Sequence, residues 1–451
     1  MRPLGLLAFL ALPLLSACSL KPIINHQVVD YLNVSAIASN QTILQNILRA
    51  KDGAPLHFGE FADIRGSLSI NTSVSSTVPY GPIGVSKSTL RDALTAGAAI
   101  SSSPSFDIDS LDTQDFTKGV MSPITPDTAE FFLNEGIDYR MVLMLLVSGV
   151  QPAGSDEMLL NEPNSSRIVC YKTPPGSNAL PSNYTIIEAG ASCAGTSEPE
   201  YYAFLRTINN AGRLYPVTAE GTPKLIGKPF NLDLPKDLRA IAAIDPTKYT
   251  MARTKNGQFQ LMSATRKTSV VMCSDTGSGP QVVGVLASSV AQVPKVPEKA
   301  CEPGNGASSE DDNVLPASAG PMKSVPVFKL RSTLEVIQYV GQVLAFQEQQ
   351  TAAHPDLPER CITLEYEKLT GPTCNGGVLF HLIGPTPGPS LEQGNSVTYN
   401  GETWSLPDPE ACTNPERCDH TLQTMSMISL LLNENKSAKD IGTTQAVQIV
   451  P

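Results

Sequence analysis

The stretch that decides the fold reads VPVFKLRSTLEVIQYVGQVLAFQEQ and spans residues 325–349. Its first part, Val325–Leu330, has the length and apolar character of a strand, and Ser332 then provides an N-cap. A helix is predicted over Thr333–Gln349 because one side of it is apolar, through Leu334, Ile337, Val340, Val343, Leu344 and Phe346. A strand that leads directly into an amphipathic helix indicates a mixed α+β core.

The remainder of the last third repeats both kinds of element. A second helix is predicted over Thr421–Asn433, and three apolar runs read as strands, over Ile362–Tyr366, Gly377–Leu382 and Val397–Leu406. The last third therefore has enough apolar surface to pack against another part of the chain.

The first third supplies the partner elements. A short amphipathic helix is predicted from the N-cap Asn40 to the stop at Lys51–Gly53, and strands follow through Leu56–Ile70. Ser, Thr, Gly and Ala dominate residues 72–103, so we expect a mobile excursion there with a helix over Leu90–Ala99. Thr125–Asn134 and Asp138–Val147 then form a helical hairpin.

The middle of the chain reads differently, with short strands and turns. A hairpin is predicted at Lys255–Gly257, and one helix over Glu198–Asn210. The acidic Pro/Ser-rich stretch Pro294–Pro321 reads as a solvated linker.

We therefore expect an α+β fold in which the two terminal thirds pack together and the middle is a β-rich, disulfide-stapled insertion. The predicted divisions are a signal peptide (1–17), a lipidated tether (18–39), an N-terminal region (40–150), the insertion with its linker (151–322) and a C-terminal region (323–451).

The first residues read as an export signal. Arg2 supplies the positive charge, Leu4–Leu15 the apolar segment, and Ser16-Ala17 the small residues before a cleavage site. Together with Cys18 this end resembles the lipobox of bacterial lipoproteins, which implies cleavage before Cys18 and acylation of its thiol. By the same resemblance, Ser19 in the following position implies sorting to the outer membrane. We expect the protein to face the periplasm, and exposure at the cell surface is the alternative.

Cysteine usage agrees with export, because eight of the nine cysteines remain for disulfides in an oxidising compartment. Connectivity does not follow from sequence alone, but nearest-neighbour pairing closes four short loops in Pro/Gly-rich stretches. The expected pairs are Cys170 with Cys193, Cys273 with Cys301, Cys361 with Cys374, and Cys412 with Cys418.

The net charge of −11 argues against binding to nucleic acid or to anionic lipid, since both require basic patches. Contact with the membrane is therefore expected through the lipid anchor on Cys18.

Both ends of the chain resemble a family of uncharacterised bacterial lipoproteins, while the middle does not. The resemblance implies export and a shared scaffold, and it transfers no catalytic residue. It is carried by Asn40–Ala50 with Asp52–Leu56, by Arg331–Leu334 with Tyr339–Gly341, and by Ser437–Asp440 with Val447–Val450.

For each motif that could carry catalysis or bind a metal, the sequence favours a structural role. Asp275–Gly279 reads DTGSG like an aspartic protease, but that chemistry needs a second such motif and none occurs, so a turn after a strand is favoured. Cys412, Cys418 and His420 are close enough for zinc, yet a disulfide is favoured. Glu310–Asn313 lacks the alternating acids of a calcium loop. We expect no metal and no cofactor.

Trp404 lies beside Tyr399 on an expected strand, so the pair is the one candidate for stacking on a sugar or another small ligand. We expect a non-enzymatic lipoprotein that acts as a scaffold or subunit of a cell-envelope assembly for secretion, pilus formation or transport, with envelope proteins as partners. A ligand-binding lipoprotein is the alternative, and a periplasmic hydrolase is the third.

Overall fold

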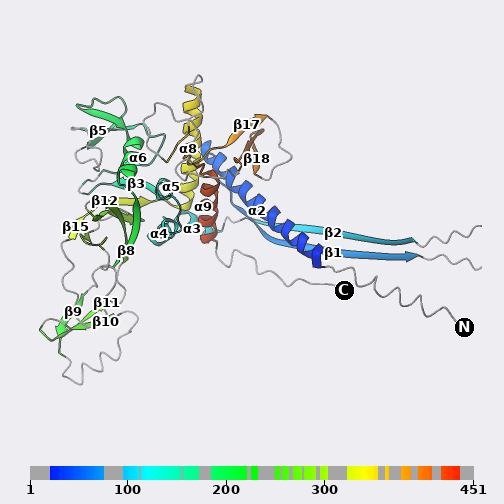
Figure 1. The fold of residues 1–451 in the computed structure, drawn as a ribbon, viewed down its shortest axis with the longest axis horizontal. Helices are drawn as coiled ribbons and strands as arrows, with labels where there is room; N and C mark the ends of the chain where they lie inside the picture. Colours follow the sequence, from blue (N-terminus) through cyan, green and yellow to red (C-terminus); the bar gives the residue numbers. More distant parts are fainter. Residues whose placement is uncertain are drawn as a thin grey trace, which may run out of the picture. The chain divides into compact units, whose positions relative to one another are not determined.

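The computed structural model describes residues 21–75, 95–110, 113–153, 155, 157–171, 184–220, 225–231, 249–253, 256–263, 268–276, 279–290, 295–302, 322–353, 361–364, 377–387, 395–408 and 418–436. The chain forms two compact units. The larger comprises residues 43–56 and 117–435, and the other comprises residues 1–42, 57–116 and 436–451. The described residues form a mixed α+β structure, as expected (Figure 1).

Helix α4 (Pro126–Asn134) begins at its predicted N-cap, Thr125, and α5 (Tyr139–Leu146) begins after Asp138, whereas the predicted N-cap Asn40 lies inside a longer helix, α2 (Lys21–Lys51). Thr125 accepts a hydrogen bond from the Thr128 N–H at 3.2 Å, and Asp138 accepts one from the Arg140 N–H at 2.8 Å. The other helices of the described chain are α3 (Gln114–Met121), α6 (Glu200–Asn210), α8 (Thr333–Ala353) and α9 (Thr421–Glu434).

Helix α8 begins with a reciprocal capping box. The Glu335 N–H donates to the Ser332 hydroxyl at 3.2 Å, and the Ser332 N–H donates to the Glu335 carboxylate at 2.7 Å. The predicted helices over α4, α5, α6, α8 and α9 are thus confirmed, with small differences at their ends.

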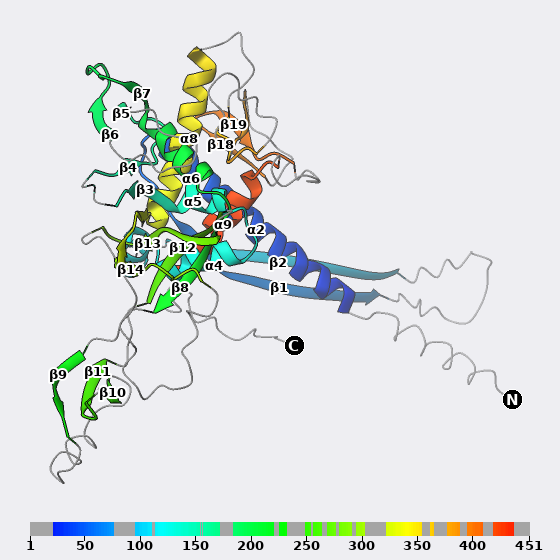
Figure 2. The ribbon, with the colours of Figure 1, turned by 60° about the vertical axis from the view of Figure 1, so that its left-hand side comes forward.

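A six-stranded sheet forms the centre of the larger unit, in the order β4-β3-β16-β13-β12-β8 (Figure 2). Its strands pair antiparallel except for β13 and β16, which are parallel. They are β3 (Val147–Gln151), β4 (Leu159–Leu160), β8 (Leu214–Glu220), β12 (Thr268–Thr276), β13 (Gly279–Ala287) and β16 (Val327–Leu330). Since this sheet combines strands from all three predicted regions, the middle of the chain shares its hydrogen bonding with both flanks.

Buried helices pack beside this sheet. All six residues from Met141 to Leu146 in α5 are at most 1% exposed, and the apolar stripe of α8 is buried at Ile337, Val340 and Val343. Helix α8 also approaches the end of α2 at Gly341, where an added Cβ would lie 2.7 Å from the Lys51 nitrogen. A side chain at position 341 would therefore collide with backbone.

Four small sheets complete the larger unit: β6-β5-β7, β10-β11-β9, β14-β15 and β17-β19-β18. The predicted hairpin at Lys255–Gly257 is confirmed as β10 with β11. The strands are β5 (Arg167–Tyr171), β6 (Tyr184–Glu188), β7 (Thr196–Pro199), β9 (Leu225–Phe230), β10 (Tyr249–Arg253), β11 (Phe259–Ser263), β14 (Lys295–Pro297), β15 (Met322–Ser324), β17 (Ile383–Pro387), β18 (Ser396–Tyr399) and β19 (Glu402–Ser405).

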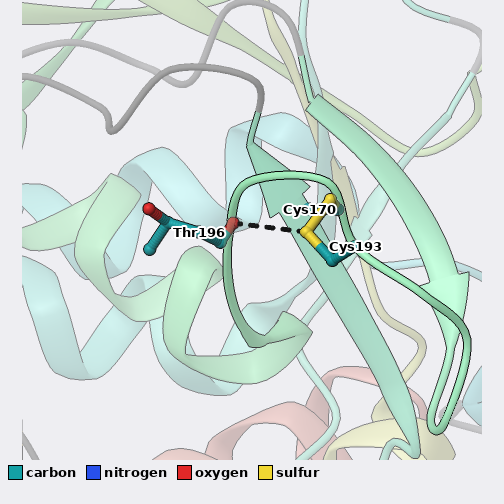
Figure 3. Close-up of a disulfide and its surroundings, with 3 residues drawn as sticks. All are labelled: Cys170, Cys193 and Thr196. Atoms are coloured by element: carbon teal, nitrogen blue, oxygen red, sulfur yellow. Dashed lines mark hydrogen bonds between the residues drawn. A yellow bond between two sulfur atoms is a disulfide. The ribbon is translucent and has the colours of Figure 1, made fainter.

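Two predicted disulfides are confirmed, Cys170–Cys193 and Cys273–Cys301. In Figure 3 the first joins β5 to the loop before β7, where the Cys193 Sγ lies 3.7 Å from the Thr196 carbonyl oxygen. Cys361 and Cys418 are also disulfide-bonded. Their predicted partners, Cys374 and Cys412, lie outside the described residues, so those two pairings stay predictions.

The smaller unit contains a long antiparallel ribbon of β1 (Gly59–Ser75) and β2 (Thr95–Ser110). The expected helix over Leu90–Ala99 is wrong from Thr95 onward, because those residues continue the register with β1. Ala and Gly have weak strand propensity, and pairing with β1 outweighs it.

Further expectations need correction. The expected solvated linker over Pro294–Pro321 contains β14, and Val296 and Cys301 within it are buried. The predicted tether (18–39) is helical from Lys21, the first described residue. Neither Gly377–Leu382 nor the described part of Ile362–Tyr366 (residues 362–364) is a strand, and the two segments share one isolated bridge, Thr363 with Val378. The single strand expected over Val397–Leu406 is two strands, β18 and β19, because Asn400 and Gly401 both adopt positive φ and turn the chain.

The close contact between α8 and α2 should reverse the effect that a Gly→Ala substitution in a helix usually has on the free energy of unfolding. Gly341→Ala would ordinarily stabilise a helix by about 1 kcal/mol. Here we expect it to lower the free energy of unfolding by about 1–3 kcal/mol, because the new Cβ meets backbone. Urea unfolding measures the change, and Gln338→Ala on the exposed side of α8 is the matched control. A stabilised Gly341→Ala variant would show that α2 and α8 do not meet here.

Candidate functional site

The most polar place in the core surrounds Arg331, between β16 and α8. Its side chain is buried, with 4% of the residue exposed. One terminal nitrogen donates to the carbonyl oxygens of Met144 (3.0 Å), Leu145 (3.1 Å) and Val147 (2.6 Å), and the other donates to the Asn161 carbonyl oxygen (2.5 Å). The guanidinium therefore satisfies carbonyls at the end of α5, where the helix dipole also favours a cation.

Two tyrosines extend this Arg331 cluster. The guanidinium carbon lies 3.9 Å from the ring centroid of Tyr339, whose hydroxyl is 3.4 Å from the Tyr201 hydroxyl. Burial raises the pKa of both tyrosines, and it lowers the pKa of Arg331 to about 10. At neutral pH the arginine is therefore charged and the phenols are neutral, which suits a structural role rather than proton transfer.

Two acidic side chains of the larger unit, Glu200 and Glu198, likewise accept hydrogen bonds from neighbouring groups of the fold. The Glu200 carboxylate accepts from the Leu160 N–H at 2.9 Å and from the Ser165 hydroxyl at 3.0 Å. Glu198 accepts from the Tyr171 hydroxyl and from Arg206, each at 2.5 Å. These contacts position β5, β7 and α6 beside the Cys170–Cys193 bridge.

A second polar cluster lies at the start of α9. The His381 Nδ1 is 3.3 Å from a carboxylate oxygen of Asp419, whose other oxygen accepts from the Thr421 N–H at 2.8 Å. Burial alone would raise the pKa of Asp419, but the hydrogen bonds from His381 and Thr421 outweigh it and lower that pKa. The side chains of His381 and Asp419 are about one-fifth exposed, at 19% and 21%.

This His381–Asp419 pair has the residue types of a general base, but its geometry is that of a helix cap. In a catalytic triad the nucleophile contacts the ring nitrogen that does not face the acid. Here the Thr421 hydroxyl lies 3.4 Å from the same Nδ1 and also accepts from the His381 N–H at 3.0 Å. The cluster therefore ties the segment before β17 to α9.

The sequence-predicted aromatic site is not exposed. Trp404 is 6% exposed, and the Lys51 ammonium lies 5.2 Å from its ring centroid at the end of α2. Tyr399 is half-buried on β18. Since stacking on a ligand requires an open ring face, this arrangement favours a packing role for Trp404.

The other candidate motifs take structural places. Asp275 is exposed in the β12–β13 hairpin and accepts from the Tyr215 hydroxyl at 3.1 Å. Cys418 is in a disulfide, and His420 pairs through Nδ1 with the Gln423 side chain at 2.7 Å. No group of three or more His, Cys, Asp or Glu residues suited to a metal occurs among the described residues. Cys18 and Glu310–Asn313 lie outside them.

Sequence reasoning missed both polar clusters. Arg331 was recognised only as part of a resemblance, although a charged residue placed directly after an apolar strand is a signal in itself. His381 reads as an isolated histidine, because its acidic partner Asp419 is distant in the chain and only folding brings them together.

The chain matches no protein-family model, and no curated protein or solved structure is detectably similar to it. No helix within the described ranges is long and apolar enough to cross a membrane.

The Arg331 cluster generates a stability prediction. Arg331→Met leaves four buried carbonyls without this donor, so we expect the free energy of unfolding to fall by about 3 kcal/mol or more. Arg331→Lys should be nearly as costly, because an ammonium cannot reproduce the planar fork. Urea unfolding measures both, with Lys329→Met on β16 as the control, expected within about 0.5 kcal/mol of wild type. Wild-type stability in Arg331→Met would rule out the capping role.

The His381–Asp419 pair generates a pH prediction. Because the folded pKa of Asp419 is lowered, its stabilising effect is present above the unfolded pKa of about 4 and is lost as pH falls through the lower folded value. Asp419→Asn should therefore unfold at lower temperature than wild type at pH 7, and the difference should shrink as pH falls below about 4 and disappear only below the lowered folded pKa of Asp419. Scanning calorimetry over a pH series from 7 downward tests this. Asp275→Asn, at an exposed position of β12, is the control substitution.

Proposed function

We propose that the chain is a non-enzymatic bacterial lipoprotein, held at the outer membrane through a lipid on Cys18, and a subunit or scaffold of a cell-envelope assembly. Leu15–Cys18 supports the anchor, since it resembles a lipobox. Disulfides at Cys170–Cys193 and Cys273–Cys301 support folding in an oxidising compartment such as the periplasm.

One observation carries the assembly role, namely the ribbon of β1 and β2. These strands have 17 and 16 residues, and within the described chain they pair only with each other. A two-stranded ribbon is marginally stable by itself, and its edges present unpaired backbone groups. A partner protein that covers this ribbon would remove both liabilities.

The chemistry of the larger unit agrees with this proposal. Its buried charged groups, Arg331 and Glu200, are held by backbone and neighbouring side chains, which gives a rigid body rather than a reactive cleft. Because Trp404 is buried, it does not offer the exposed aromatic ring on which the ligand-binding alternative was based. The geometry of His381 and Asp419 gives no support to a hydrolase.

The anchor has a direct test. Trypsin does not cut between Lys21 and Pro22, so cleavage before Cys18 creates the tryptic peptide Cys18–Arg49, and we expect mass spectrometry of the membrane-extracted protein to find it with acyl chains. Such acyl chains would hold the protein at the membrane, because each buried methylene adds about 0.8 kcal/mol of membrane affinity. A mature chain that starts elsewhere or carries no acyl group would contradict the anchor.

The assembly role requires a separate experiment. A C-terminally tagged chain is cross-linked in intact envelopes, solubilised in detergent and purified, with Cys18→Ala as the control. We expect envelope proteins in stoichiometric amounts with the wild type and a loss of these proteins with Cys18→Ala. Recovery of the tagged chain alone, in both cases, would exclude a stable envelope assembly.

A further inference from the structure

The β1–β2 ribbon has two faces of different character. Residues two apart on a strand share a face, and from the pair Asp63 and Asp107 onward the register pairs even-numbered positions of β1 with even-numbered positions of β2. The even positions include Ile64, Leu68, Ile70 and Val74, opposite Phe106, Ser102, Ile100 and Ala96. The odd positions from Ser67 to Ser75 are Ser or Asn, and they face Ser, Ala, Gly or Thr.

The part of the ribbon formed by Gly66–Ser75 of β1 and Thr95–Phe106 of β2 is also uncharged. It contains no Asp, Glu, Lys or Arg, although the whole chain has a net charge of −11. Strand edges in soluble proteins are normally protected by charges, prolines or covering segments. The edge of β1 over Gly66–Ser75 has neither a charge nor a proline.

The edge of β2 differs because of Pro104. Proline has no N–H and is found in sheets where its nitrogen faces away from the neighbouring strand. Pro104 is opposite Gly66, so this rung is one whose backbone groups point outward. Pro104 thus interrupts the free edge of β2, whereas the free edge of β1 is continuous.

A strand that covers the whole free edge of β1 must be of similar length. The next longest described strands, β12 and β13, have nine residues each and already pair on both sides in the six-stranded sheet. Helix α2 could cover a face of the ribbon, but only a strand satisfies an edge. Within the described chain, a strand with the required length and a free, uninterrupted edge is β1 itself.

We therefore infer that two copies of this chain associate through antiparallel pairing of β1 with β1 of the second copy, across a two-fold axis within Gly66–Ser75. The contact is self-complementary, as a two-fold interface requires. It yields a four-stranded sheet, β2-β1-β1-β2, with the apolar positions of both copies on one face. This dimer rests on the proposed function, because that function requires a partner for the ribbon and the dimer identifies the partner as a second copy of the chain.

Thr72 and Ala98 provide a matched pair of variants. They are opposite each other, and both occupy rungs of the same parity as Gly66 and Pro104, so both N–H groups face away from the ribbon. Thr72→Pro removes an outward donor from β1, and Ala98→Pro removes one from β2. Each leaves the hydrogen bonds between β1 and β2 in place.

The experiment measures the mass of the full lipidated chain in detergent by sedimentation velocity, over a concentration series. We expect a wild-type dimer, a dissociation constant at least about tenfold higher for Thr72→Pro, and an unchanged dimer for Ala98→Pro. Far-UV circular dichroism and the thermal midpoint check that each variant is folded. A monomeric wild type, or equal behaviour of the two variants, would overturn the inference.

Hydrogen exchange provides a readout that needs no variant. Peptides that cover β1 should gain protection in wild-type protein as its concentration rises through the dissociation constant, while peptides that cover β2 should not. Protection of both strands only after addition of phosphatidylglycerol vesicles would assign the ribbon to lipid instead. The purified protein contains no envelope partner, so failure of the dimer and failure of the envelope assembly are separate results.

Discussion

The fold of the larger unit depends on how the carbonyl groups at the end of α5 are satisfied. A helix leaves its last carbonyls without partners, and α5 ends inside the core, where water does not reach them. The Arg331 guanidinium donates to them from the junction of β16 and α8, and the Asn161 side-chain amide also donates to the carbonyls of Met144 and Val147. These two side chains thus fix the end of α5, the exit of β16 and the start of α8 against each other.

Two of the segments that we expect, from sequence, to resemble other lipoproteins meet near Arg331. Ser332 caps α8, Tyr339 stacks on the guanidinium, and Gly341 lets α8 approach the end of α2. At that end, Leu44, Ile47 and Leu48 are buried in the core. The two resembling segments are therefore parts of one packing arrangement, and none of these contacts requires a substrate.

Sequence patterns predicted local structure well where one residue determines it. Ser332 and Thr125 mark helix starts, Asn256-Gly257 marks a hairpin, and neighbouring cysteines identify two disulfides. Pairing over long distances was not predictable, because the alternation that makes β2 a strand is weak in Ala, Gly and Ser and depends on β1. The His381–Asp419 pair fails for the same reason, since no local signal joins its members.

The position of β16 in the central sheet bears on when the protein folds. β16 lies between β3 and β13, so the sheet is two separate pieces until residues 327–330 are present. Such non-local pairing slows folding, because β3 and β13 cannot complete their pairing until β16 is present. The core of the larger unit therefore cannot be complete until the chain has been synthesised beyond residue 330, so every shorter chain exposes the edges of β3 and β13 that β16 later covers.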